Sequence, residues 1–283
     1  MNTPTPSPSP LPTSALILRE LDQGVMTLTM NNPKRLNGWT MPMMDALKAA
    51  FAEAAERDEV KVIILTGTGP YYCAGVNLSS TLRFGHPKKL HGLIIEYNQA
   101  LFDMFLDFPK PILVAINGHA IGASVTSAMI CNGVIAAEEA TFSTPFVALG
   151  LCAEGCSSVQ FARLMGEESA QRMLGAEGWK PSATAAQAAG LIEWVSSADT
   201  LMEEANKIAR SWVEQGVSRS FRGGDREELK AVNARESIAL ADAFLATPFL
   251  KAQLRFLLKK KKYAPAGMFG AMLVTRPLWS WLL

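Results

Sequence analysis

The 283-residue chain has the composition of a globular protein, with 49% hydrophobic and 19% charged residues. Its formal net charge is only +1, so charge gives no reason to expect nucleic acid or an acidic partner. The four cysteines lack both Cys-x-x-Cys spacing and nearby histidines, so we expect no metal site and predict reduced thiols that are mostly buried. They are Cys73, Cys131, Cys152 and Cys156.

Both ends of the sequence are atypical of a packed core. Residues 1–14 are rich in Pro, Ser and Thr and contain no Lys or Arg, which predicts a disordered lead rather than a signal or transit peptide. The apolar tail, 264–283, is interrupted by Arg276 and Pro277, so we expect no transmembrane segment. Burial against another subunit is the preferred explanation of its apolar side chains, and membrane association is the alternative.

The first half of the chain alternates between strand and helix patterns. The helix expected at 40–57, for example, repeats Met44, Leu47, Phe51 and Ala54 at intervals of three and four. The expected strands are 15–21, 25–30, 60–65, 112–116, 134–137 and 141–143, and the expected helices are 40–57, 90–108 and a small-residue helix ending near 131. A glycine turn is expected at 118–122.

Helical patterns dominate the chain after Ser157. They are expected at 158–165, 168–174, 182–189, 200–215, 225–246 and 249–262. Alternating strands and helices followed by helices alone predict an α/β architecture with a helical C-terminal extension. The run Lys259–Lys262 is interpreted as a solvated helix end, with a phosphate contact as the alternative.

Several common catalytic motifs are absent. Residues 67–72 begin like a dinucleotide-binding turn, but Tyr72 replaces the third glycine, and no P-loop or Gly-x-Ser-x-Gly elbow is present. The three histidines have no serine placed beside them by any motif, which disfavours a Ser–His–Asp hydrolase. We expect His119, next to a glycine turn, to have a structural role.

Five segments together resemble the crotonase (enoyl-CoA hydratase/isomerase) superfamily in matching order. They are 36–38 (Leu-Asn-Gly), 62–67 (Val-Ile-Ile-Leu-Thr-Gly), 73–78 (Cys-Ala-Gly-Val-Asn-Leu), 110–118 (Lys-Pro-Ile-Leu-Val-Ala-Ile-Asn-Gly) and 140–145 (Ala-Thr-Phe-Ser-Thr-Pro). The resemblance covers about residues 16–212. It implies a spiral of ββα units over 15–212 and a helical trimerisation region over 213–283, giving a homotrimer or a dimer of trimers.

The resemblance also implies an oxyanion hole, in which backbone N–H groups stabilise charge on a thioester oxygen. Its donors would be the N–H groups of Val76 and Ala123, with Gly75 and Gly122 allowing a close approach of the backbone. Each such donor is typically worth about 3–4 kcal/mol in the transition state. Ordinary strand–helix turns are the alternative explanation of either glycine motif taken alone.

The resemblance makes Glu154 the candidate catalytic base. Hydratases of the superfamily use two glutamates, and the matching places here hold Thr126 and Phe146. Residues 153–158 (Ala-Glu-Gly-Cys-Ser-Ser) instead resemble the motif of peroxisomal-type Δ3,Δ2-enoyl-CoA isomerases, with alanine in place of proline. Apolar neighbours would raise the pKa of Glu154 toward neutrality. Alternatively, Glu154 only precedes a helix that is capped by Ser157 or Ser158.

The remaining predicted contacts concern the acyl-CoA substrate, whose coenzyme A moiety makes a separate cofactor unnecessary. Ala74, Gly122 and Phe146 are expected to contact the acyl-CoA substrate, and residues 82–97 are expected to line the acyl pocket. Further CoA contacts are assigned to Lys34, Arg35, Phe256 and Lys259, and Asn77 is expected either to bind Glu154 or the ligand or to stabilise its turn.

The favoured function is therefore a Δ3,Δ2-enoyl-CoA isomerase of fatty acid β-oxidation. Enoyl-CoA hydration, dienoyl-CoA isomerisation and non-catalytic acyl-CoA binding stay open as alternatives. The final Leu282-Leu283 is not a Ser-Lys-Leu peroxisomal address. The compartment is thus left open among a peroxisome-like organelle, a mitochondrion and a bacterial cytosol.

Overall fold

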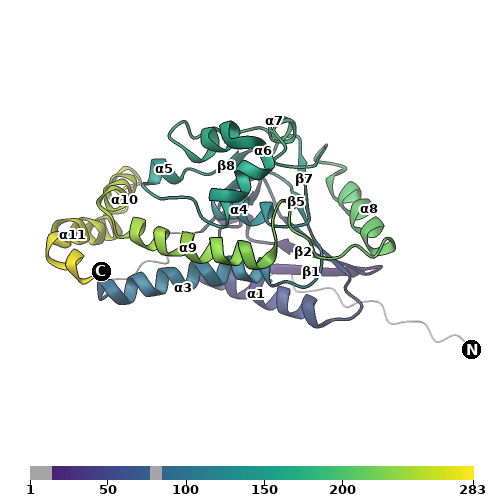
Figure 1. Cartoon of the computed structure of the whole chain (residues 1–283), viewed down its shortest axis with the longest axis horizontal. Helices are drawn as coiled ribbons and strands as arrows, with labels where there is room; N and C mark the ends of the chain where they lie inside the picture. The colour runs from purple at the N-terminus through teal and green to yellow at the C-terminus, as the bar shows by residue number, and fades with distance from the viewer. Residues whose placement is uncertain (1–14, 77–84) are drawn as a thin grey trace, which may run out of the picture.

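The computed structural model describes residues 15–76 and 85–283, which form two β-sheets surrounded by helices (Figure 1). The larger sheet has the order β1-β2-β3-β5-β7-β9, and every neighbouring pair except β1–β2 is parallel. Its strands are Ile17–Asp22, Val25–Met30, Val62–Gly67, Ile112–Ile116, Gly133–Ala137 and Trp194–Ser196. The smaller, parallel sheet is β4-β6-β8, formed by Tyr71–Cys73, His119–Ile121 and Phe142–Ser143.

Successive ββα units build both sheets at once. Each of β3, β5 and β7 lies in the larger sheet, and the strand that follows it lies in the smaller sheet. Helices complete the units: α1 (Met41–Glu56), α3 (Pro87–Leu106), α4 (Ala123–Met129) and α5 (Phe146–Leu149). The predicted α/β spiral of ββα units is confirmed.

The rest of the described chain is mostly helical. The segment η1 (Pro33–Arg35) precedes α1, and α6 (Ser157–Leu174), α7 (Ala183–Ala188) and α8 (Leu201–Glu214) follow α5. The predicted C-terminal helical region consists of α9 (Arg226–Phe244), α10 (Thr247–Lys259), α11 (Tyr263–Trp279) and η2 (Ser280–Leu282). In Figure 1, α9 lies along α3, while α10 and α11 form the end of the molecule opposite α8. No helix within the described ranges is long and apolar enough to cross a membrane.

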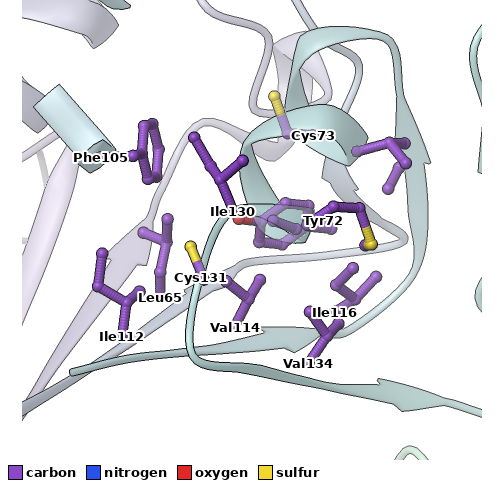
Figure 2. Close-up of a cluster of buried hydrophobic side chains, with 14 of the residues drawn as sticks. Leu65, Tyr72, Cys73, Phe105, Ile112, Val114, Ile116, Ile130, Cys131 and Val134 are labelled. Atoms are coloured by element: carbon purple, nitrogen blue, oxygen red, sulfur yellow. The ribbon is translucent and has the colours of Figure 1, made fainter. Parts of the chain in front are cut away.

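Apolar strands are buried on both faces of the larger sheet, as their uninterrupted hydrophobic runs predicted. Val114 of β5 faces the cluster around Tyr72, Phe105 and Cys131 (Figure 2). Leu113, the preceding residue, packs on the opposite side beneath α8. Alternate side chains of one strand therefore serve two cores, which explains why the run shows no polar alternation.

The α1 helix illustrates how local sequence sets an element boundary. The Thr40 hydroxyl accepts a hydrogen bond of 3.4 Å from Met43 N, and Pro42 occupies the first turn, where no intrahelical N–H donor is needed. Leu47, Phe51 and Ala54 are buried, as their spacing predicted.

Several short elements differ from the expectations. The expected turn at 118–122 contains strand β6, while β4, β9 and α5 were not predicted; each has only three or four residues, too few for a periodic signal. The two helices expected at 158–165 and 168–174 form one element, α6, with a kink at Gly166, where φ is +78°. The tail forms α11 with Pro277 inside it. The run Lys259–Lys262 is exposed at the end of α10, as predicted.

Candidate active site

The first glycine loop, residues 74–76, runs beside the segment that precedes α1. Ala74 N donates to Leu36 O at 3.0 Å, and Trp39 N donates to Gly75 O at 2.8 Å. Asn37 anchors this segment, because its fully buried side chain accepts from Asn32 N and donates to two backbone carbonyls at 2.8 and 2.9 Å. The Leu-Asn-Gly motif is thus a structural support of the first loop.

The second glycine loop, residues 121–123, lies directly against the first. A β-carbon added to Gly75 would lie 2.5 Å from Ile121 O and 3.8 Å from Ala123 N. Ser124 connects the two loops, since its hydroxyl lies 2.9 Å from Cys73 O and accepts from Ile121 N at 3.0 Å. Two segments separated by about fifty residues in sequence therefore present their backbones side by side.

Val76 and Ala123 each present an N–H group in these loops. Neither N–H donates to another group within residues 15–76 and 85–283. Ala123 is the first residue of α4, where N–H groups lack intrahelical acceptors. Both N–H groups therefore lack a described acceptor, and their role as oxyanion-hole donors stays a prediction.

A cavity of about 580 Å³ opens onto both loops. Its described walls come from α1, α3, α5, α9, the two glycine loops and the loop that carries Glu154, and they are mostly apolar. Of the predicted site residues, those in the walls are Ala74, Val76, Gly122, Ala123, Phe146 and Glu154. Between α3 and α9 the cavity is lined by Leu90, Leu93, Ile94, Tyr97, Leu240 and Phe244. A chamber of this composition suits an acyl chain.

Glu154 supplies the one carboxylic acid among the described residues of the cavity wall. Its residue is 8% exposed, and no described side chain or N–H group forms a hydrogen bond with its carboxyl group. Burial, followed by the negative charge of Glu236, raises the pKa of Glu154 to about 8. This agrees with the expected effect of its apolar surroundings, of which Phe146, Leu149 and Leu151 also line the cavity.

The loop that carries Glu154 leads into α6 through two left-handed residues, Gly155 at φ +62° and Cys156 at φ +67°. The helix begins at Ser157, and the Ser157 hydroxyl donates to Glu154 O at 2.6 Å. The alternative in which Ser157 or Ser158 caps the helix is wrong, because both residues lie within α6. The capping interactions come instead from Glu236 of α9, which accepts hydrogen bonds from Cys156 N and Ser158 N.

The two positions that resemble the hydratase glutamates contain no second acid. Thr126 is buried, and its hydroxyl donates to Ala123 O at 3.3 Å. Phe146 contributes an aromatic ring to the cavity wall. The arrangement therefore offers one titratable carboxyl group next to the two loops.

The other predicted CoA contacts lie away from the described cavity wall. Lys34 and Arg35 are exposed on η1, and Phe256 and Lys259 are exposed on α10. Their roles stay predictions, and Asn77 lies outside the described residues. The prediction that 82–97 lines the pocket is confirmed for its described part, which includes His86, Lys89, Leu90, Leu93, Ile94 and Tyr97.

The sequence analysis missed one polar residue of the cavity wall, Asn98, whose amide donates to Ser237 of α9 at 3.0 Å. It named His86 and Lys89 only as members of the range 82–97. No motif marks Asn98, and only its helical spacing from Ile94 and Leu101 could have indicated it. His119, by contrast, contacts the Thr141 hydroxyl at 2.8 Å, in line with its expected structural role. No group of three potential metal ligands occurs in the part of the chain that the structure describes.

Comparisons with known proteins agree with this geometry. The model of the enoyl-CoA hydratase/isomerase family matches residues 20–224. An uncharacterised protein of Caenorhabditis elegans is 36% identical over 244 residues, covering 82% of this chain and 92% of the relative. Human enoyl-CoA delta isomerase 2 is 32% identical over 250 residues, covering 85% of this chain; the chain spans only 63% of that relative's length.

Solved structures give the same assignment. The crystal structure of an enoyl-CoA hydratase/isomerase from Pseudoalteromonas atlantica aligns with a TM-score of 0.72 at 26% identity. The alignment covers 86% of this chain and 97% of that structure. The family model, the relatives and the shared fold lead to one conclusion: the chain belongs to the enoyl-CoA hydratase/isomerase family.

Proposed function

We propose that the protein is a Δ3,Δ2-enoyl-CoA isomerase, with Glu154 as the single acid–base residue. The observation that carries this proposal is the position of Glu154, which is buried in the same apolar cavity that the Val76 and Ala123 loops line. A substrate thioester placed against those two N–H groups would bring the carbons next to it into this cavity.

The reaction needs only one proton to be moved. The Glu154 carboxylate takes the proton from C2 of a 3-enoyl-CoA, and the C–H electron pair enters the conjugated system as a dienolate, with its charge on the thioester oxygen. The Glu154 carboxylic acid then returns the proton to C4. The C=O bond re-forms, the double bond moves to C2–C3, and the glutamate is again a carboxylate.

The described groups suit each step of this scheme. The two N–H donors stabilise an oxyanion more than a neutral carbonyl, so they lower the barrier to proton removal. A carboxyl pKa of about 8 makes Glu154 a stronger base than an ordinary glutamate while leaving it partly ionised near neutral pH. Positioned proton transfer of this kind contributes about 10²–10⁴-fold in rate.

The alternative functions make different demands on the site. Hydration needs a water activated by a second carboxylate, and the two matching positions hold Thr126 and Phe146. A purely acyl-CoA-binding module has no need of a buried carboxyl group without a described hydrogen-bond partner in its cavity, since burying such a group is unfavourable. Dienoyl-CoA isomerisation uses related proton transfers, so dienoyl-CoA is assayed as a separate substrate.

A conversion assay with 3-enoyl-CoA tests the proposal. We expect wild-type protein to form 2-enoyl-CoA, Glu154→Gln to lose at least 100-fold in kcat while keeping its affinity for CoA, and the exposed control Glu139→Gln to match wild type. A wild-type protein that binds CoA but converts no 3-enoyl-CoA would support the binding module. Conversion of 2,4-dienoyl-CoA or 3,5-dienoyl-CoA, without conversion of 3-enoyl-CoA, would support dienoyl-CoA isomerisation.

The cellular setting is proposed on the same basis. Fatty acid β-oxidation would place the enzyme in a peroxisome-like organelle or a mitochondrion, or in a bacterial cytosol. We further propose a homotrimer or a dimer of trimers, supported by the exposed apolar side chains of α11 and η2, including Val274, Leu278 and Trp281. Sedimentation velocity tests this assembly, and a monomer at micromolar concentration would contradict it.

A further inference from the structure

A second buried carboxyl group, that of Glu236, holds the segment immediately after Glu154. Its residue on α9 is 6% exposed. One carboxyl oxygen accepts from Cys156 N at 2.6 Å and the other from Ser158 N at 2.9 Å. Glu236 is outside the described cavity wall, so its carboxyl group acts on the backbone of this loop rather than on a ligand.

We infer that Glu236 is a positioning residue for Glu154: by accepting hydrogen bonds from Cys156 N and Ser158 N at the start of α6, it holds the loop that carries the Glu154 carboxyl group against the cavity. This inference rests on the proposed function. Glu236 belongs to the C-terminal helical region and lies 82 positions after Glu154 in sequence.

The turn needs an external support because its backbone is unfavourable. Gly155 and Cys156 both have left-handed φ values, and Cys156 has a β-carbon that disfavours this conformation. No side chain within the turn itself caps α6. Two contacts from α9 hold Cys156: its N–H binds Glu236, and its thiol donates to Leu229 O at 3.2 Å.

Space around the turn is also restricted on its other side. A β-carbon on Gly155 would lie 2.3 Å from the ring of Phe102 on α3 and 2.6 Å from the Thr126 hydroxyl. The turn is therefore confined between α3, α4 and α9. Release of the Glu236 contacts would leave one of these three sides open, which would let the Glu154 carboxyl group move away from the glycine loops.

The electrostatic arrangement gives Glu236 its second effect. Two N–H donors at the start of α6 stabilise the ionised form of Glu236, although burial raises its pKa. Glu154 has no such described donors, so the charge of Glu236 adds to the effect of burial and favours the protonated form of Glu154. The other titratable groups near Glu154 are Cys152 and Cys156 from its own loop and His86, Lys89 and Tyr97 from the α3 side of the cavity.

Glu236→Gln and Glu236→Asp separate charge from position. The glutamine variant removes the charge but keeps an oxygen acceptor. We expect the apparent pKa of the acidic limb in the pH profile of kcat/KM to fall by roughly one unit, and the plateau value of kcat to fall about tenfold. The aspartate variant keeps the charge on a shorter side chain. We expect it to retain the acidic limb and lose kcat, with little change in KM.

Glu228→Gln is the matched control. Glu228 also joins α9 to α6, through Arg163, but its ion pair is partly exposed and lies in the first turn of α9, two helical turns before Glu236. We expect this variant to keep both the acidic limb and kcat. Equal loss in the Glu228 and Glu236 variants would show that any weakening of the α6–α9 contact has the same result, which would overturn the inference.

A direct titration keeps this test independent of the isomerase activity. The Glu154 carboxyl carbon, labelled with ¹³C and assigned with Glu154→Gln, should titrate near pH 8 in wild type and at lower pH in Glu236→Gln. An unchanged titration would refute the electrostatic effect even if no 3-enoyl-CoA is converted. If Glu236→Gln does not fold, wild-type kcat in Glu236→Asp would overturn the positioning role.

Discussion

Gly75 and Ile121 touch backbone to backbone, with only 2.5 Å between an added β-carbon at Gly75 and the carbonyl oxygen of Ile121. The contact joins two loops whose residues Val76 and Ala123 line the same cavity. Glycine is favoured at position 75 for two reasons. A β-carbon would clash with Ile121 O, and the backbone φ of +76° disfavours any other residue. The close approach of the two glycine loops therefore depends on one residue without a side chain.

The first prediction compares Gly75→Ala with Gly122→Ala. Both glycines have positive φ, but a β-carbon on Gly122 meets no atom within 4 Å. We expect Gly122→Ala to lose about 1–2 kcal/mol of stability from backbone strain alone, and Gly75→Ala to lose about 3 kcal/mol or more because the loops must separate. Thermal and urea unfolding measure the difference. Equal losses would mean that the loops adjust without cost.

The second prediction concerns the dependence of stability on pH. The pKa of Glu154 is raised to about 8 by burial and by Glu236, so the folded protein retains a proton that the unfolded chain loses near pH 4.5. Between pH 4.5 and about pH 8, folding therefore takes up a proton. In this range the free energy of unfolding of the wild type falls as pH rises, by at most about 1.4 kcal/mol per pH unit.

Glu154→Gln removes this effect, because glutamine does not ionise. We expect the variant to resemble wild type below pH 4.5 and to be more stable than wild type above pH 8, as measured by calorimetry. The exposed control Glu139→Gln should follow the wild-type curve at every pH. A Glu154→Gln variant that is less stable than wild type at pH 9 would contradict the buried, partly protonated state.

Local sequence patterns predicted the helices and strands that are determined by the residues within them. The spacing of Leu47, Phe51 and Ala54 predicts α1, and the uninterrupted apolar run of 112–116 predicts β5. The family resemblance carried by the glycine and Glu154 motifs implied the ββα spiral, and it named Val76, Ala123 and Glu154, which meet in one cavity. These features depend either on contacts between residues that are close in sequence or on motifs that occur together in the family that the chain resembles.

Longer-range features had no comparable signal. Strand β4 has three residues and exists because it pairs with β6, about fifty positions later. Glu236 lies within an ordinary charged helix pattern, and only the fold brings it to the N–H of Cys156. Ser124 similarly gains its role from the proximity of Cys73. Such contacts are set by tertiary packing, which periodicity cannot show.

The third prediction tests Lys34 and Arg35 as CoA contacts. Both are exposed on η1, and the backbone of the following Leu36 accepts a hydrogen bond from Ala74 in the first glycine loop. We expect Lys34→Ala and Arg35→Ala each to weaken CoA binding roughly fivefold, about 1 kcal/mol, and less so at high salt. Isothermal titration with CoA measures this, with exposed Lys48→Ala on α1 as the control. Unchanged affinity in both variants would move the phosphate contacts to other cations, of which Lys89 in the cavity wall is the first to test.

The fourth prediction concerns the length of the acyl chain. Leu93 lies on α3 in the part of the cavity that faces α9, and it is 45% exposed, so a larger side chain can be accommodated without unfolding the helix. Leu93→Trp would occupy space that a long acyl chain needs. We expect kcat/KM to fall at least tenfold for a twelve-carbon 3-enoyl-CoA and to change less than threefold for a six-carbon one, since each excluded methylene is worth about 1 kcal/mol or more.

Ala100→Trp is the control for this substitution, because Ala100 is exposed on the same helix and is not part of the described cavity wall. It should leave both substrates unaffected. If Leu93→Trp slows the two substrates equally, the indole disturbs the shared thioester end rather than the chain. The acyl group would then leave the cavity by another side, and the α3–α9 chamber would not set chain-length preference.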